Sequence, residues 1–243
     1  MKSALIAIIA LALLSTLSCT TLPEYGHGSV GTDTALIPAP FRGGGAEEVG
    51  ETLAGVQIGL GALYNSNDFN GLARAFIQRG DNLGWFAFTY GASGFGGLYT
   101  VTSGTRSYYG GSLHGSAMFL IPFEAVEIRL LGFQAAVTYE NGEFHDFRQN
   151  AAGISNIAPD PLLVGFGGFT EVCVKLGEEA RLGIRVGVGG TQSDFRSGND
   201  PDPTASLGAY FTFSPVTVWL QMENVVMLSH SPALVAGVAY RLF

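Results

Sequence analysis

The chain has 243 residues, of which 47% are hydrophobic, only 13% are charged and 35 are glycine. A chain this apolar and aromatic is not disordered, and its glycines lack the Gly-X-Y period of collagen. The formal net charge of −8 argues against nucleic acid as a partner, because a nucleic-acid-binding face would be basic.

The first 18 residues have the features of a signal peptide. Lys2 precedes an unbroken apolar run over residues 4–14, which is shorter than the about 20 residues that a helix needs to cross a bilayer core. Residues 15–19 read STLSC and resemble a bacterial lipobox, although leucine stands directly before the serine rather than two places before it. The resemblance implies that Cys19 is lipidated and becomes the mature N-terminus. The alternative is an ordinary signal peptide that contains a cysteine.

The pattern changes twice after the signal peptide. Residues 19–50 contain Gly, Pro and Thr without periodicity and are predicted to form a lipid-anchored periplasmic tail or linker. From residue 51 onwards, apolar residues recur at every second position, as in a strand with one apolar face. The opposite face of the first segment carries Gly and Gln rather than charged residues, as the lumen side of a barrel strand does. Residues 51–243 are therefore predicted to form a single β-barrel domain.

Ten segments show this alternation, each near the about 9–11 residues that a tilted strand needs to cross a bilayer. They are residues 51–64, 69–79, 83–92, 107–120, 124–140, 162–176, 180–193, 204–214, 216–226 and 233–243. The prediction is an all-β fold, an antiparallel up-and-down transmembrane barrel of about ten strands, with eight or twelve as alternatives. The pair Leu130-Leu131 interrupts the alternation, which predicts a β-bulge or a twist nearby. The apolar face is predicted to carry no isolated charge at mid-membrane, where each would cost roughly 2–4 kcal/mol.

The connections differ in length between the two ends of the predicted barrel. Tight turns follow the second, fourth, sixth and eighth strands, and longer segments follow the third, fifth, seventh and ninth: residues 93–106, 141–161, 194–203 and 227–232. Short turns at one end and long loops at the other are typical of outer-membrane barrels. An even number of strands places both termini at the short-turn end, which we expect to be periplasmic.

The end of the chain resembles the C-terminal signature of bacterial outer-membrane barrels. Residues 239–243 read AYRLF, an amphipathic last strand that ends in Phe243. The resemblance covers the architecture of residues 51–243 and names no functional family. It implies a location in the outer membrane of a double-membraned bacterium, contact with outer-membrane lipid, and recognition of the last strand by the barrel assembly machinery.

One hairpin is specific enough to predict its register. Residues 177–179, Gly-Glu-Glu, fit a three-residue turn between the sixth and seventh strands. This turn places Lys175 opposite Arg181 and Glu171 opposite Arg185, so that the second pair joins opposite charges on the lumen face.

The polar face of the strands is predicted to line the lumen. Its members are Gln57, Arg74, Gln78, His114, Ser116, Gln134, Glu171, Lys175, Arg181, Arg185, Gln221, Glu223 and Arg241. The side on which Glu127 and Arg129 lie stays open. Charges of both signs can pair across a narrow lumen and be structural, or they can form a selectivity lining for small solutes.

A short motif on the fourth strand raises the question of catalysis. His114-Gly115-Ser116 resembles the His-x-Ser spacing of outer-membrane phospholipase A and of the lipid A deacylase, which implies Ser116 as nucleophile and His114 as base. The polar residues that follow the serine in those enzymes are replaced by Ala117, Met118 and Phe119. The alternation also turns the pair towards the lumen, away from lipid substrates. We therefore interpret the pair as lumen-filling and assign no catalytic residue.

Two acidic clusters lie in predicted loops. One resembles a carboxylate–imidazole cluster at the rim of the outer-membrane aspartyl-type proteases but supplies only one of two acidic pairs: Glu143, His145 and Asp146. The other is rich in oxygen ligands but matches no known calcium loop: Asp194, Asn199, Asp200 and Asp202. Both are predicted to be solvated loops, and no metal or cofactor is expected.

These observations favour a small outer-membrane lipoprotein with a non-enzymatic role in anchoring, scaffolding or binding. A narrow channel for small solutes is the first alternative. A membrane-embedded lipid hydrolase that uses His114 and Ser116 is the second.

Overall fold

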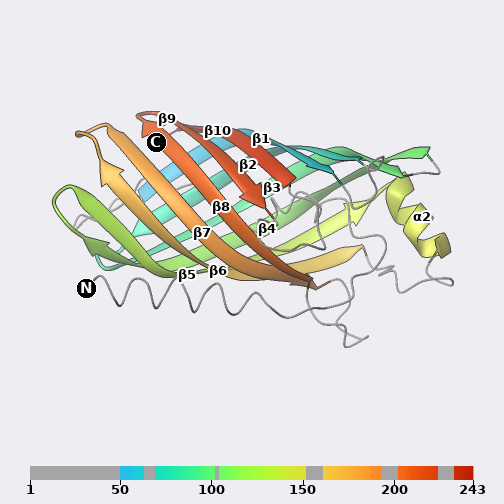
Figure 1. Cartoon of the computed structure of the whole chain (residues 1–243), viewed down its shortest axis with the longest axis horizontal. Helices are drawn as coiled ribbons and strands as arrows, with labels where there is room; N and C mark the ends of the chain where they lie inside the picture. Colours follow the sequence, from blue (N-terminus) through green and yellow to red (C-terminus); the bar gives the residue numbers. More distant parts are fainter. Residues whose placement is uncertain are drawn as a thin grey trace.

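The computed structural model describes residues 50–62, 69–101, 104–151, 161–192, 202–223 and 233–242. These residues form one closed barrel in which each strand pairs antiparallel with its neighbours in sequence and the first strand pairs with the last (Figure 1). The predicted ten-stranded antiparallel barrel is confirmed. No helix in the described ranges is long and apolar enough to cross a membrane.

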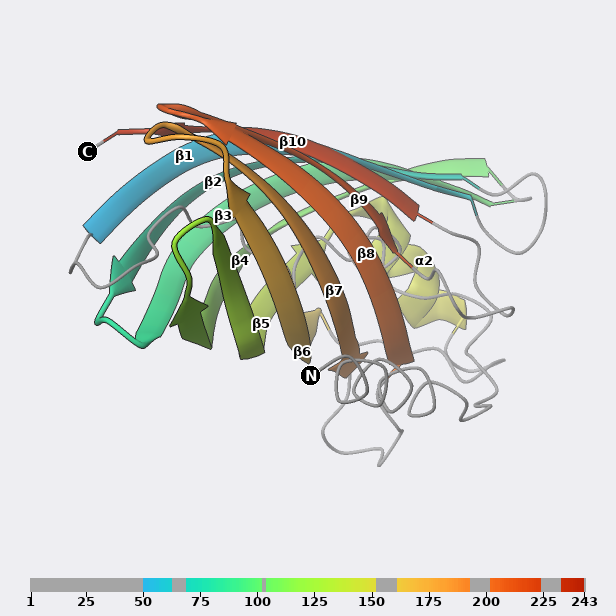
Figure 2. The ribbon, with the colours of Figure 1, turned by 60° about the vertical axis from the view of Figure 1, so that its left-hand side comes forward.

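The elements follow one another in the order of the chain. They are β1 (Gly50–Ala62), β2 (Phe69–Asn82), β3 (Phe86–Val101), β4 (Gly104–Pro122), β5 (Val126–Asn141), α2 (Glu143–Ala151), β6 (Leu162–Lys175), β7 (Ala180–Gln192), β8 (Asp202–Phe213), β9 (Val216–Glu223) and β10 (Ala233–Arg241). Tight turns join the strands at one end of the barrel, and α2 lies at the other, as Figure 2 also shows. The end with the tight turns is called the turn end below, and the end with α2 is called the loop end.

One predicted loop is wrong. Residues 93–101 and 104–106 continue the ladder between β3 and β4, whose pairs run from Phe86↔Phe119 to Val101↔Gly104. Glycines at 94, 96 and 97 lower the strand propensity of this segment, and for that reason the alternation was lost in the sequence. Pairing with the neighbouring strand outweighs that weak local preference.

The register predicted for the β6–β7 hairpin is confirmed. Lys175 pairs with Arg181 and Glu171 pairs with Arg185. The backbone N–H of Leu176 donates to the carbonyl oxygen of Ala180 at 2.9 Å and closes the three-residue turn.

The bulge predicted at Leu130-Leu131 is also confirmed. Arg129 pairs with Glu171 but Gly132 pairs with Phe169, so three steps along β5 match two along β6. Leu131 has a φ of 49° and exposes its side chain on the outer face. Odd-numbered residues face inward before the bulge and even-numbered residues face inward after it. The structure thereby places Glu127 and Arg129 inside the barrel.

The outer wall of the barrel is apolar. Val56, Ile58 and Leu60 on β1 are about half exposed, and every other strand presents a similar row. The exposed Arg79 lies beside Asp81 at the turn end, with Nη2 and Oδ1 3.1 Å apart, whereas Arg74 and Arg185 are buried. An apolar belt around a closed antiparallel barrel is the architecture of outer-membrane β-barrels.

The inner wall pairs glycine with aromatic residues in a regular way. Six aromatic side chains lie over the glycine directly opposite them on the neighbouring strand, so that a Cβ on that glycine would come within 3.0 Å of a ring atom. The pairs are Phe76–Gly55, Tyr108–Gly97, Phe95–Gly110, Phe169–Gly132, Tyr210–Gly183 and Trp219–Gly237. Each ring covers the backbone of the glycine opposite it, where a larger residue would have covered its own backbone with its side chain. The glycine content of the chain therefore serves packing inside the lumen.

Candidate functional site

A network of charged side chains occupies the lumen beside β5, β6 and β7. The side chains of Glu127, Arg129 and Glu171 have no exposed surface. Arg129 Nε lies 2.8 Å from Glu127 Oε1, and Arg129 Nη1 lies 2.8 Å from Glu171 Oε1. Arg185 approaches the other oxygen of Glu171, with Nη2 2.7 Å and Nε 2.8 Å from Oε2. Each buried charge thus has an opposite charge in contact, which offsets the cost of removing it from water.

Neighbouring side chains extend this network across the inner wall. The hydroxyl of Tyr210 on β8 donates to Glu171 Oε1. Arg181 Nη1 lies 3.8 Å from Glu127 Oε2, and the guanidinium of Arg185 lies 4.5 Å from the centre of the Phe169 ring. The network therefore links four consecutive strands, β5 to β8. Of its members, the sequence predicted the Glu171–Arg185 pair but missed Tyr210, whose only signal is that Gly183 faces it.

The structure places most of the predicted lumen residues on the buried inner face: Gln57, Arg74, Gln78, Ser116, Gln134, Glu171, Arg185 and Gln221. Four others are half-buried: His114, Lys175, Arg181 and Arg241. Arg241 Nη2 donates to Ser214 Oγ at 2.7 Å near the turn end. The side chain of Glu223 lies outside the described residues.

His114 and Ser116 both lie on the inner face of β4 but are not brought together. The Ser116 hydroxyl lies 2.7 Å from Thr89 Oγ1 on β3, and the two share a hydrogen bond. His114 Nε2 is buried and, within the described ranges, has no hydrogen-bond partner. The pair therefore lacks the nucleophile–base hydrogen bond that a serine hydrolase needs.

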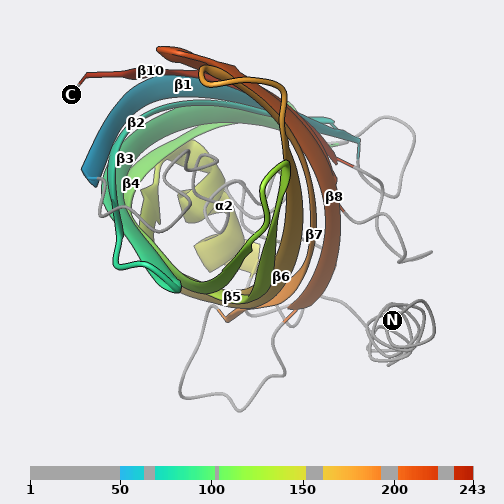
Figure 3. The same cartoon turned by 90° about the vertical axis from the view of Figure 1, so that its left-hand side faces the viewer.

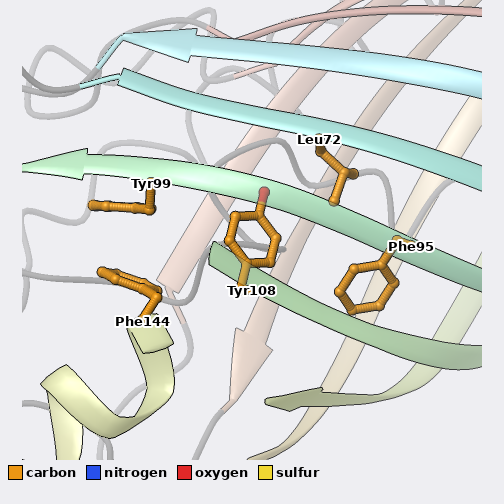
Figure 4. Close-up of a cluster of buried hydrophobic side chains, with 5 residues drawn as sticks. All are labelled: Leu72, Phe95, Tyr99, Tyr108 and Phe144. Carbon is orange, nitrogen blue, oxygen red and sulfur yellow. The ribbon is translucent and has the colours of Figure 1, made fainter. Parts of the chain in front are cut away.

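The acidic cluster at residues 143–146 is not the solvated loop that the sequence predicted. Residues Glu143–Ala151 form α2, and Phe144 is completely buried. Its ring stacks on Tyr99 with centroids 3.9 Å apart and lies 6.4 Å from the ring of Tyr108 (Figure 4). Polar residues dominate this segment, but Phe144 and Phe147 are three apart and share one face of a helix. That spacing is the signal that the loop prediction overlooked.

Two hydrogen bonds tie the start of α2 to the edge of β4. The backbone N–H and the hydroxyl of Ser107 both donate to Glu143 Oε2, at 3.0 and 2.8 Å. These bonds, first the one from the backbone N–H, lower the pKa of the Glu143 carboxyl below its ordinary value of 4.5. The guanidinium of Arg106 also lies 3.9 Å from the centre of the Phe147 ring.

The remaining candidates fall largely outside the described residues. These are Cys19 with the tail that follows it, the C-terminal Phe243, and the loop residues Asp194, Asn199 and Asp200. The side chain of Asp202 is likewise not described. Across the described ranges, no three His, Cys, Asp or Glu side chains gather as a metal site would require.

Several solved structures show a distant similarity to this chain. No known protein family and no curated protein matches the chain. The translocator domain of the autotransporter NalP from Neisseria meningitidis is 11% identical, with a TM-score of 0.47 over 99% of this chain and 97% of that one. An outer-membrane channel from Pseudomonas putida F1 is 10% identical, with a TM-score of 0.42 over 84% and 100%. LpxR from Salmonella typhimurium is 9% identical, with a TM-score of 0.40 over 79% and 99%. All three structures are at most 11% identical to this chain, and their similarity assigns it no function.

Proposed function

We propose that this protein is a non-enzymatic outer-membrane anchor whose lumen is closed to solutes and whose loop end is the part that binds or scaffolds. The observation that carries the proposal is the complete burial of Glu127, Arg129 and Glu171. Charged groups that line an open pore are in contact with water. Here they contact one another instead, and their side chains have no surface that solvent reaches.

The loop end supports the same proposal. Seen along the barrel, α2 lies inside the outline of the strands (Figure 3). Its Phe144 is held against the inner wall by Tyr99 and Tyr108. A channel would leave this end free for solutes, and an anchor has no such need.

The proposal also covers the attachment and orientation of the chain. Cys19 carries a lipid, and the N-terminus lies in the periplasm. The support is the sequence STLSC before the mature chain and the alternation of tight turns with longer connections. Mass spectrometry of the mature protein tests the lipid: an added acyl mass that Cys19→Ser abolishes is expected.

Conductance tests the closed lumen. The purified protein is inserted into planar bilayers, with a general porin in the same bilayers as the control for insertion. We expect no steady unitary current from the protein. A stable current of defined size would overturn the closed lumen and favour the channel.

Hydrolysis tests the non-enzymatic part. Phospholipid vesicles incubated with the purified protein should release no fatty acid above background, because Ser116 faces the lumen and bonds to Thr89. Release that is lost in Ser116→Ala would establish the hydrolase instead.

A further inference from the structure

We propose that α2 is a hinged lid over the loop end of the lumen, fastened by Glu143 on Ser107 and seated by Phe144 against the inner wall. This inference goes beyond the anchoring role. It states that access to the loop-end half of the lumen is controlled by one helix.

The seat consists of side chains from three strands. Phe144 enters a cluster formed by Leu72 on β2, Phe95 and Tyr99 on β3 and Tyr108 on β4. Figure 4 shows its ring pointing from α2 into this cluster. The Tyr108 hydroxyl donates to Asn70 Oδ1 at 2.8 Å, which fixes one wall of the seat. The seat is therefore formed by the barrel and does not depend on α2 for its shape.

The fastening is polar and lies at the surface. Glu143 is exposed and Ser107 is half-buried, so both groups can be hydrated when they separate. The Glu143 carboxylate accepts both hydrogen bonds as a charged group, and these bonds lower its pKa. A hydrogen bond at the surface can therefore break and form again at low cost. The buried ion network cannot separate in this way, because its charges would be left in the lumen without partners.

The hinge is Gly142, between β5 and α2. Its φ of +119° is a conformation that residues with a side chain rarely adopt. A Cβ there would also lie 2.8 Å from the carbonyl oxygen of Ser107. The helix thus turns sharply from the end of β5 back over the lumen, and only glycine fits at the turn.

The wall beneath the lid is polar. Ser93 and Ser112 face each other across β3 and β4 with their hydroxyl oxygens 2.7 Å apart, and His114 lies next to them on the inner face. Both Ser93 and His114 retain exposed surface although they lie mid-strand. The proposal takes this remaining exposure to be towards the lumen below α2, and the labelling of Ser93→Cys tests it directly.

Thiol labelling tests the lid in the full-length protein. Ser93→Cys places a reporter below α2, and the labelling rate with a small charged thiosulfonate reagent is measured in detergent micelles. Glu143→Ala removes the fastening and is expected to raise this rate about tenfold, the change that 1.4 kcal/mol produces. Glu143→Gln keeps an acceptor oxygen and should fall between. Asp146→Ala, an exposed acid on the same helix, is the matched control and should leave the rate unchanged.

The native thiol separates this proposal from the closed lumen. Cys173 is fully buried beside the ion network on β6, towards the turn end. It should stay unlabelled in every variant. If the labelling rate of Ser93→Cys is the same with and without Glu143, α2 is not a lid, and the proposal of a closed lumen is unaffected. Rapid labelling of Cys173 in the otherwise native protein would overturn the closed lumen and leave the lid standing.

Phe144→Ala gives a second test of the seat. Loss of the ring leaves α2 without its buried anchor, so labelling of Ser93→Cys should exceed the rate in the Glu143→Ala variant. Heat-modifiable migration on a gel shows in the same samples whether the barrel itself is folded. A folded Phe144→Ala barrel that labels as slowly as the parent contradicts the proposal.

Discussion

Among single residues, Glu171 has the most demanding environment. It is fully buried and accepts contacts from Arg129, Arg185 and Tyr210. A buried carboxylate is tolerated here because two guanidinium groups neutralise its charge. An ion pair at this depth does not by itself stabilise a protein more than an apolar contact does. Its removal takes away the carboxylate that Arg129 and Arg185 share and leaves Arg129 with Glu127.

Glu171→Ala is therefore expected to lower the free energy of unfolding by about 3–5 kcal/mol. Urea unfolding in micelles, followed by the change in gel mobility, gives the measurement. Glu179→Ala in the exposed β6–β7 turn is the control and should cost close to nothing. Equal losses in the two variants would show that the network does not stabilise the barrel.

The sequence predicted only part of this network. Glu171 and Arg185 follow from the register of a three-residue turn, which fixes opposite residues by simple counting. Glu127 and Arg129 could not be assigned to a face, because alternation on β5 is interrupted at Leu130-Leu131. Tyr210 is not among the predicted site residues, since nothing in a single strand indicates which residue lies across from it.

At the level of the strands, the pairing of glycines with aromatic rings explains a composition that otherwise weakens β-structure. An inward glycine and the ring opposite it form one packing unit across two strands. The unit joins neighbouring strands through side chains as well as through the backbone ladder. Gly97, which belongs to such a unit, and its neighbours Gly94 and Gly96 obscured β3 in the sequence, where propensity alone suggested a loop.

Gly183→Ala tests this packing unit. A methyl group there would overlap the ring of Tyr210. Such overpacking costs typically 1–3 kcal/mol, measured as a lower urea midpoint. Gly94→Ala, which has only the carbonyl oxygen of Gly110 within 4 Å, is the matched control and should leave the midpoint unchanged or raise it. Similar destabilisation at both positions would show that contact with the ring does not determine the role of these glycines.

The helix α2 shows a different limit of sequence reasoning. Its polar residues were recognised and its two phenylalanines were not weighed, because a nine-residue helix carries little periodic signal. Its position over the lumen depends on Tyr99 and Tyr108, which lie more than thirty residues earlier in the chain. Contacts of that kind are fixed by the closed barrel and not by the local sequence.

For the whole molecule, the apolar outer wall and the polar ends define how the barrel sits in a membrane. The tight turns and the loop end differ in length, which in outer-membrane barrels corresponds to the periplasmic and the external side. Recognition of the strand period in the sequence was enough to obtain the barrel, since the period of two is a direct result of backbone geometry.

Cysteine labelling of intact cells tests the orientation. Asn150→Cys on the exposed part of α2 should react with a membrane-impermeant maleimide. Glu179→Cys in the β6–β7 turn should react only after the cells are permeabilised. The reverse pattern would place the turns and the N-terminus outside and contradict the proposed periplasmic tail.

The bulge on β5 has a consequence for how this strand tolerates change. Leu131 is the extra residue at which the alternation changes. Before it the odd-numbered residues of β5 face the lumen, and after it the even-numbered residues do. Deletion of this one leucine would give β5 a single uninterrupted alternation. Either Glu127 and Arg129 would then turn towards lipid, or the apolar row that begins at Phe133 would turn into the lumen. A residue with no contact to the ion network thus determines whether the network lies inside the barrel at all.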